Sequence, residues 1–205
     1  MNDSNNEPVG DAAVPEAGSR EDCDCSRCDC ALDHIQLEAH WDLANMFASI
    51  DHSVLDRVIQ SLMDARHVLV VSRDKDQICA IHMQRSAARR FCNWQHVRGS
   101  TRETVEFSAI LAPCDVVVGL ALGPFDHSSP FNGHTLLLAK RARAIGARVI
   151  GLVDRLESTF SAHANDVLRV PGLRPLTFPT YLPAMVLVEA LVEILGVRCE
   201  GAPAE

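Results

Sequence analysis

Hydrophobic positions along this chain switch repeatedly between two periods. Runs of consecutive apolar residues, such as HVLVVS at 67–72 and DVVVGL at 115–120, alternate with segments in which apolar residues recur every three or four positions. The first pattern predicts buried strands and the second predicts amphipathic helices. The predicted elements are, in chain order, helices over 34–49 and 53–62, a strand over 67–72, a helix over 77–91, a strand over 94–98, a helix over 101–111, a strand over 115–120, a helix over 134–145, a strand over 148–153, a short helix over 158–164, a strand over 166–170 and a helix over 181–195.

The alternation of strands and helices predicts the fold class. Strands that are apolar throughout indicate parallel pairing with both faces of the sheet covered. With right-handed crossovers, this order predicts an α/β fold, a three-layer α/β/α sandwich around a five-stranded, parallel, doubly wound sheet. Ligands bind such sheets at the carboxyl ends of the strands, near the switch in strand order. We therefore expect the site in three loops, 72–76, 121–135 and 153–158.

The beginning of the chain differs in composition from the rest. Residues 1–22 are rich in Asn, Asp, Glu, Pro, Gly and Ala and show no hydrophobic periodicity, which predicts a disordered tail over 1–31 and a folded domain over 32–200. The tail holds eight acidic residues and two arginines, which is −6 of the net charge of −8 and leaves −2 for the remainder. A nearly neutral body lacks the clustered cations of a nonspecific nucleic-acid binder, so no direct contact with nucleic acid is expected.

Length and hydropathy limit the chain further. The 205 residues, 47% of them hydrophobic, suffice for one domain with a buried core plus an appendage. The longest uncharged apolar stretch, 175–188, has about 14 residues and is interrupted by prolines, which is too short to span a bilayer. No segment resembles a secretory signal. We expect a cytoplasmic protein without a membrane segment.

Four stretches resemble a known family. They are LDRVIQSLMDARHVLVVS at 55–72, APCDVVVGLAL at 112–122, LAKRARAIGARVIGLVD at 138–154 and LESTFSAHANDVLRVP at 156–171. Together they resemble the sugar isomerase (SIS) domain, most closely the version in RpiR-type bacterial regulators that sense sugar phosphates. The resemblance covers about 39–196 and implies a homodimeric domain that binds a phosphorylated sugar or amino sugar and needs no cofactor.

The chain also departs from the family pattern. The usual G-x-G-x-S turn after the first strand is replaced by Ser-Arg-Asp-Lys-Asp at 72–76, which has neither glycine. The usual Ser-x-Ser-Gly-x-Thr loop after the central strand is replaced by a longer segment, 121–135. RpiR-type regulators carry an N-terminal helix-turn-helix domain, for which this chain has no room. The resemblance therefore implies a diverged SIS domain without a DNA-binding domain.

Two loops supply the candidate ligand-binding residues. In the long loop, hydroxyl and amide groups precede a predicted helix, whose exposed N–H groups favour a phosphate. In the first loop, a hydroxyl and two cations follow a strand. The candidates are Ser72, Arg73, Lys75, Ser128, Ser129, Asn132 and Thr135. The alternatives are ordinary turn and capping residues in the long loop and, in the first loop, a solvated turn whose Asp74 or Asp76 caps the next helix.

Catalysis would require a base near the sugar's C1–C2 bond, because aldose–ketose isomerisation moves a proton through an enediol. Family isomerases use Glu or His for this step, and the candidates here are Glu103 and His134, with Glu106 and His127 behind them. None lies in a recognisable motif, and Glu103 also fits an exposed helix face. His82, His96 and His163 are interpreted as structural.

The eight cysteines include a tight cluster, Cys23, Cys25, Cys28 and Cys30. Thiolates at this spacing bind zinc or another soft metal. The alternatives are a flexible thiol-bearing tail and redox sensing. The cysteines at 79, 92 and 114 fall in helix or strand patterns and are interpreted as core residues.

Three functional hypotheses remain open. The first is a non-catalytic sugar-phosphate-binding sensor or regulator of sugar metabolism. The second is a sugar-phosphate isomerase with a rebuilt loop. The third is an interaction module whose cysteine tail binds metal or a partner. The ridge of Leu187, Leu191 and Leu195 on the last helix is interpreted as core, although similar helices help SIS domains to dimerise.

Overall fold

A computed structural model describes residues 28–72, 76–98, 100–122, 130–154, 159–170 and 181–200. The chain divides into two compact units, Met1–Leu37 and Glu38–Glu205. The described part of the first unit is the beginning of helix α1 (Cys28–Ser49). The sheet and the helices that cover it belong to the second unit.

The second unit is built on a five-stranded sheet. Its strands are β1 (Val68–Ser72), β2 (Trp94–Val97), β3 (Val116–Ala121), β4 (Arg148–Val153) and β5 (Asp166–Arg169). They pair in the order β2-β1-β3-β4-β5, and every pair is parallel. The order reverses between β1 and β3, so the doubly wound sheet and its switch point confirm the predicted fold class.

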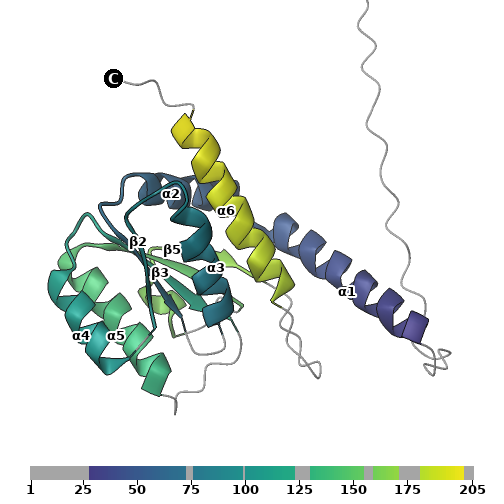
Figure 1. Cartoon of the computed structure of the whole chain (residues 1–205), viewed down its shortest axis with the longest axis horizontal. Helices are drawn as coiled ribbons and strands as arrows, with labels where there is room; N and C mark the ends of the chain where they lie inside the picture. The colour runs from purple at the N-terminus through teal and green to yellow at the C-terminus, as the bar shows by residue number, and fades with distance from the viewer. Residues whose placement is uncertain are drawn as a thin grey trace, which may run out of the picture. The chain divides into compact units, whose positions relative to one another are not determined.

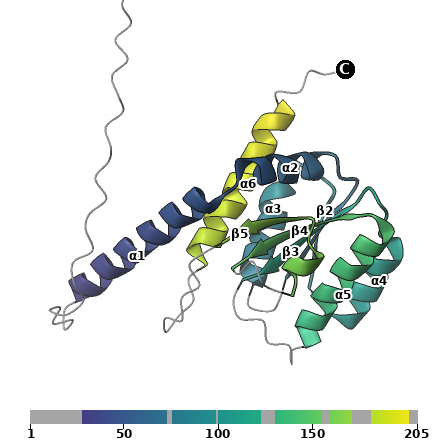
Figure 2. The same ribbon diagram turned by 180° about the vertical axis from the view of Figure 1, so that it is seen from behind.

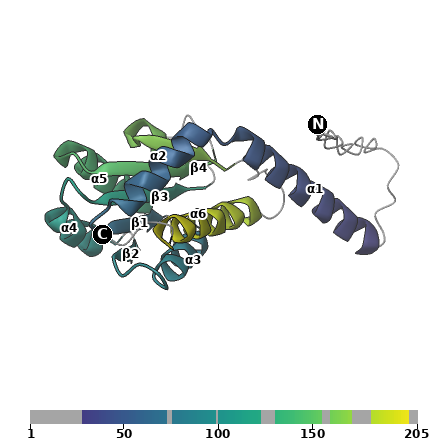
Figure 3. The ribbon, with the colours of Figure 1, turned by 90° about the horizontal axis from the view of Figure 1, so that it is seen from above.

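Helices cover both faces of the sheet (Figures 1, 2 and 3). One face carries α2 (His52–Met63), α3 (Gln77–Ala87) and α6 (Leu182–Glu200), whose buried residues form one core with Val68 and Val70. The other face carries α4 (Thr101–Ile110) and α5 (Pro130–Ile145), which pack on Leu69 and Val71. Adjacent strand residues thus point into opposite cores.

The last helix shows why one predicted boundary is wrong. Leu187, Leu191 and Leu195 are buried in the core, as predicted. Gly196 does not end the helix, however, because α6 continues to Glu200. The guanidinium of Arg90 lies where a Cβ at Gly196 would stand, so this glycine permits a close approach. Gly146, with φ +89°, does follow the end of α5 as predicted.

Other boundaries also differ from the predictions. Helix α5 begins at Pro130, four residues before the predicted start, because proline is favoured in the first turn of a helix. Helix α1 begins at Cys28, so residues 28–31 of the predicted tail are helical. The segment 28–49 contains neither Gly nor Pro, and a helix can continue beyond the residues that pack. The short helix predicted over 158–164 is a single 3₁₀ turn, Ser161–His163.

None of the described helices is long and apolar enough to cross a membrane.

Candidate functional site

The carboxyl end of β1 places a buried hydroxyl beside the switch point. All five residues of β1 are buried, and its last residue, Ser72, is paired with Leu120 of β3. Short apolar strands of this kind are fixed by burial on both faces, so Ser72 has a defined position at this edge. Ser72 is the one residue of the predicted first-loop set that the structure describes, since Arg73 and Lys75 lie outside the described residues.

A neighbouring histidine completes the environment of Ser72. His96 on β2 is paired with Val70, two residues before Ser72, so the His96 and Ser72 side chains share one face of the sheet. Ser72 Oγ and His96 Nε2 lie 3.3 Å apart. The sequence interpretation of His96 as merely structural missed this contact, because strand register decides which residues of β2 face the end of β1.

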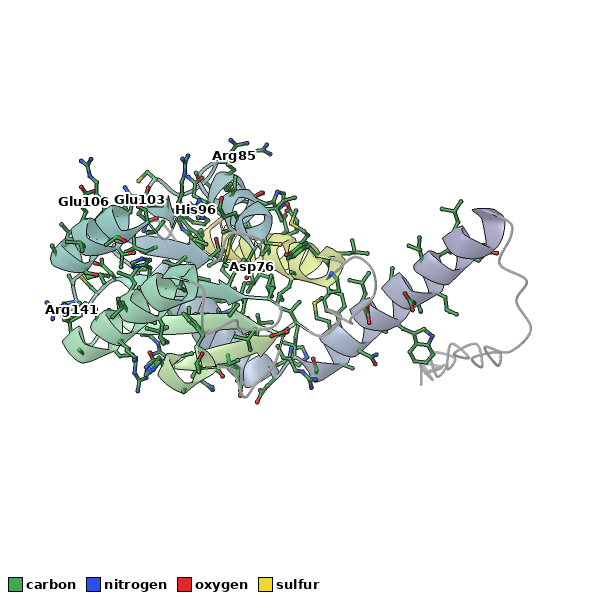
Figure 4. All side chains as sticks on the ribbon, turned by 90° about the horizontal axis from the view of Figure 1, so that it is seen from below. Asp76, Arg85, His96, Glu103, Glu106 and Arg141 are labelled. Carbon is green, nitrogen blue, oxygen red and sulfur yellow. The ribbon has the colours of Figure 1, made fainter. Side chains whose placement is uncertain are left out.

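The local environment favours the neutral imidazole at His96. Burial lowers the pKa of His96 below its ordinary value, and the charge of Arg98 lowers it further, while Glu103 acts in the opposite direction. Figure 4 labels His96 together with Glu103 and Asp76. A neutral imidazole can accept a hydrogen bond at one ring nitrogen and donate one at the other, which suits it to contact a hydroxyl group.

Asp76 connects the two strands on either side of the switch point. This residue is completely buried at the start of α3, and its side chain does not cap that helix. Its Oδ2 instead accepts a hydrogen bond of 3.2 Å from the backbone N–H of Leu122, directly after β3. The alternative prediction of Asp76 as a helix cap is therefore wrong. The carboxylate thus fixes Leu122, at the carboxyl end of β3, to the start of α3.

Glu103, one of the two predicted catalytic candidates, forms hydrogen bonds in the first turn of α4. Ser100 Oγ accepts a hydrogen bond of 3.2 Å from the N–H of Glu103. The Glu103 carboxylate in turn reaches back and accepts one of 3.1 Å from the N–H of Arg98. The first bond satisfies a donor of the helix N-terminus, and the second ties the first turn of α4 to the backbone that leaves β2. The structure thus gives Glu103 a role in beginning α4.

The other catalytic candidate joins α4 to α5. His134 Nε2 lies 3.1 Å from the Oγ1 of Thr101, the first residue of α4. Helices α4 and α5 also pack against each other along their lengths. The contact therefore ties the beginnings of the two helices together near the ends of β2 and β3. In the described part of the chain, no hydrogen bond or ion pair joins His134 to Glu103.

Thr135 is a predicted ligand residue whose buried hydroxyl stands out in the structure. It lies near the beginning of α5, is 2% exposed, and its Oγ1 has no hydrogen-bond partner within the described part of the chain. A buried hydroxyl without a partner is costly, so such a group marks a place where a ligand or water supplies the missing bond. Asn132 also lies in the first turns of α5, but its side chain is outside the described set, as are Ser128 and Ser129.

The predicted metal cluster is not placed by the structure. Cys28 and Cys30 lie at the beginning of α1, but their side chains, and Cys23 and Cys25 entirely, fall outside the described residues. Elsewhere, where side chains are described, no group of three or more His, Cys, Asp or Glu residues is arranged to hold a metal ion.

The remaining cysteines differ from one another in exposure. Cys79 is buried, and burial together with the nearby Asp76 carboxylate raises the pKa of its thiol to about 12. That thiol stays protonated, as expected for a core residue. Cys92 and Cys114 are exposed, so their predicted place in the core is wrong. Both lie in the turns that precede β2 and β3, which the strand pattern alone does not separate from the strands.

Comparison with known proteins identifies the fold. No protein-family profile and no curated protein matches the chain. Among solved structures, the sugar isomerase domain of an RpiR transcription factor from Sphaerobacter thermophilus is similar, with a TM-score of 0.74, 15% identity, and coverage of 82% of this chain and 90% of the other. The Vibrio vulnificus NanR protein complexed with ManNAc-6P has a TM-score of 0.69, 16% identity, and coverage of 82% and 62%.

An enzyme has the same architecture. Phosphoheptose isomerase from Neisseria gonorrhoeae has a TM-score of 0.63, 14% identity, and coverage of 82% of this chain and 98% of its own. Regulators and isomerases are thus both among the structural neighbours, and the shared property is the SIS-like fold.

Proposed function

Because this chain has the fold of the sugar isomerase domain, we propose that it binds a phosphorylated sugar or amino sugar at the carboxyl ends of β1 and β3. We further propose that it acts as a non-catalytic, cytoplasmic sensor or regulator of sugar metabolism. The solved neighbours include one protein complexed with ManNAc-6P, which has this chemistry.

The buried Thr135 hydroxyl is the observation that carries this proposal. Its Oγ1 lacks a partner among the described residues, near the beginning of a sixteen-residue helix whose first N–H groups are available to an anion. Gly133, His134 and Thr135 also keep the Gly-x-Thr end of the family's Ser-x-Ser-Gly-x-Thr pattern. A phosphate oxygen accepting from Thr135 would remove the cost of the unsatisfied group.

The roles of the two predicted bases support the absence of catalysis. Glu103 accepts a hydrogen bond from the Arg98 N–H, and His134 contacts Thr101. A general base must reach the proton that it removes. Groups engaged at the beginning of α4 are better explained as positioning residues for the helices around the site.

A thermal-shift screen against sugar phosphates tests the proposal. We expect one phosphosugar to raise the melting temperature, while the unphosphorylated sugar and inorganic phosphate have little effect. A hundredfold excess over Kd stabilises the folded state by about 2.7 kcal/mol. At the same ligand concentration Thr135→Val should lower the stabilisation by about half, as a tenfold weaker Kd requires. Thr104→Val, at a buried threonine of α4, should preserve it. A screen in which no phosphosugar stabilises the wild-type protein would contradict the proposal.

One observation favours the second candidate function, aldose–ketose isomerisation. His96 has a lowered pKa and lies 3.3 Å from Ser72, so a neutral imidazole is available as a base beside the proposed sugar site. A coupled aldose–ketose assay tests this function directly. Turnover that is lost in His96→Gln but retained in His163→Gln, at a half-buried histidine of the 3₁₀ turn, would establish it. No turnover with a phosphosugar that binds would eliminate it.

The cysteine cluster motivates a separate proposal. Under the interaction-module hypothesis, the cluster binds metal. Because α1 begins at Cys28, deleting residues 1–31 would remove helical residues, so substitution is the better test. Metal analysis should find zinc or another soft metal in the full chain and less of it after all four of Cys23, Cys25, Cys28 and Cys30 are changed to Ser. Equal metal content in both proteins would exclude the cluster as the ligand set.

We propose a homodimer on the evidence of exposed apolar residues. The ridge of α6 is buried within one chain and is therefore used by the core. Val105 and Ile110 on α4 and Leu137 on α5 are each more than half exposed on two helices that pack together. Burying such residues against a second copy would be favourable. Light scattering should find a dimer that Leu137→Glu weakens, and a monomer at all concentrations would contradict it.

A further inference from the structure

A pocket lies at the amino ends of the central strands, at the edge of the sheet opposite the proposed sugar site. Its volume is about 390 Å³, which is within the range of small-molecule sites. Three segments form it, the second half of α2, the turn before β3 and the first residue of β4. They contribute Arg57, Gln60, Ser61, Asp64, Ala65, Pro113, Cys114, Asp115, Val116 and Arg148.

Two arginines that line the pocket are held in fixed positions. Asp166, whose side chain is 1% exposed, accepts a hydrogen bond of 2.9 Å from Arg57 Nε and one of 2.7 Å from Arg148 Nη2. Both guanidinium groups are about half exposed. Two cations share a single buried anion, so one positive charge is left over beside the pocket. Arginine has five N–H donors, and this pairing leaves several of them for an anionic ligand.

An acidic residue lines the pocket at the end of α2, seven residues after Arg57. Asp64 is exposed, and its Oδ1 accepts a hydrogen bond of 2.9 Å from Gln60. That partner is neutral, and Asp64 forms no ion pair with another described residue. The carbonyl end of α2 adds the negative pole of a helix dipole at the same place. This side of the pocket therefore favours a cation.

The remaining carboxylate of the pocket is neutralised within the protein. Asp115 accepts hydrogen bonds of 2.9 and 2.8 Å from Arg66 and a third from the Ala112 N–H. Burial raises the pKa of Asp115, but these hydrogen bonds and the charges of Arg66 and His67 outweigh burial and bring it below its ordinary value. Asp115 thus shapes the pocket as part of an ion pair and adds no net charge.

From these positions we infer that the pocket is a second ligand site, which binds a small zwitterion. The anionic group of the ligand, a carboxylate or a phosphate, contacts Arg57 and Arg148. Its ammonium group contacts Asp64 at the end of α2. A ligand with only one of these charges would satisfy one side of the pocket and leave a like charge near the other. This inference is independent of the proposed sugar site.

An exposed cysteine in the pocket provides a local measurement. Cys114 lines the pocket, whereas Cys92 and Cys199 are exposed outside it. Alkylation by neutral iodoacetamide, followed at each cysteine by peptide mass spectrometry, reports occupancy at Cys114 with the other two as internal references. A ligand present at about ten times its Kd leaves about one tenth of the sites open and slows alkylation by about tenfold.

The probes separate charge pattern from charge alone. L-glutamine carries a carboxylate and an ammonium, and O-phosphoethanolamine carries a phosphate and an ammonium. Acetate, inorganic phosphate and ethanolamine carry one kind of charge each. At constant ionic strength we expect saturable protection of Cys114 by at least one zwitterion and weaker protection by the single-charge probes. Equal protection by a single-charge probe, or no selective protection at Cys114 by any probe, would overturn the inference.

Substitutions test the two sides separately. Arg148→Gln should abolish protection by a zwitterion, and Arg57 still pairs with Asp166 in that variant. Asp64→Asn disrupts none of the described ion pairs and should abolish the preference for a zwitterion over the matching anion. Arg102→Gln removes an exposed arginine on α4 and should leave protection unchanged. Retention of the preference in a folded Asp64→Asn protein would also overturn the inference.

Discussion

Buried polar groups have different partners at the two edges of the sheet. At the amino edge, the buried carboxylates Asp115 and Asp166 are each paired with arginine, and Asp166 is paired with two. At the carboxyl edge, buried hydroxyls stand beside neutral groups. Ser72 has a single contact of 3.3 Å with His96, and the Thr135 Oγ1 has no partner in the part of the chain that is described.

This difference separates groups that stabilise the fold from groups that, in our proposal, bind a ligand. A buried carboxylate without partners would carry a large desolvation cost, and at Asp115 and Asp166 arginines offset that cost. A buried hydroxyl costs less, about 1–3 kcal/mol, and that cost can be recovered when a ligand binds. We therefore expect substitutions at the amino edge to act mainly on stability and those at the carboxyl edge mainly on binding.

Asp166→Asn should have the largest effect on stability. It removes the shared anion and leaves Arg57 and Arg148 close together with like charge. We expect a loss of about 2–4 kcal/mol in the free energy of unfolding, measured by urea denaturation. The matched control is Asp56→Asn, which breaks the exposed ion pair with Arg198 and should cost about 0–1 kcal/mol. Equal losses of unfolding free energy in the two variants would contradict the special contribution of the buried carboxylate at the amino edge.

Asp76→Ala should have the next largest effect, because it tests the one buried carboxylate at the carboxyl edge. The variant loses the hydrogen bond that joins the start of α3 to the Leu122 N–H. We expect a loss of about 1–3 kcal/mol in denaturant unfolding and weaker phosphosugar binding. Asp76→Asn keeps an acceptor oxygen and should lose less. A fully stable Asp76→Ala protein would show that the hydrogen bond between Asp76 and Leu122 does not stabilise the fold.

Thr135→Val should separate stability from binding most clearly. The substitution replaces a buried, unpartnered hydroxyl with a methyl group of similar shape, so we expect stability to be unchanged or to rise by about 1 kcal/mol. Phosphosugar affinity should fall by about tenfold, which corresponds to one lost hydrogen bond of about 1.4 kcal/mol. Calorimetric titration measures the affinity. A clear loss of stability with intact affinity would assign Thr135 to the fold.

His96 should produce the smallest effect, and a pH-dependent one. Its pKa in the folded protein is lowered from 6.5, so just below pH 6.5 the unfolded chain binds a proton that the folded protein does not. Stability from this group is therefore present above pH 6.5 and decreases as pH falls toward the lowered pKa. The fall in melting temperature between about pH 7.5 and 5.5 should be smaller in His96→Gln than in wild type.

A bound phosphosugar sharpens the same measurement. Negative charge near His96 favours the imidazolium, so ligand binding should raise the pKa of His96 in an NMR titration. His163, on the 3₁₀ turn, serves as the reference in the same spectra and should titrate alike with and without ligand. No change at His96 on binding would place the phosphate away from β2.

The hydrophobic pattern was sufficient for the fold because burial leaves a periodic record in the sequence. All five strands were predicted, β1, β3 and β4 from apolar runs and β2 and β5 from their place between helical segments, and spacing of three or four predicted the helices that cover them. Boundaries were less well predicted where glycine served another purpose, as at Gly196, or where a helix extended beyond its packed residues, as α1 does at Cys28. A linear pattern does not record which side chain occupies the space beside a glycine.

For the site, the sequence predicted a position at the carboxyl ends of the strands and named Ser72 and Thr135 among its residues. The contacts around that position follow from the packed structure alone. It placed His96 beside Ser72 through strand register, turned Asp76 from its helix toward the Leu122 N–H, and engaged Glu103 in beginning α4. Burial is encoded locally because it follows the period of each element, whereas a hydrogen bond between distant segments depends on how the elements pack together.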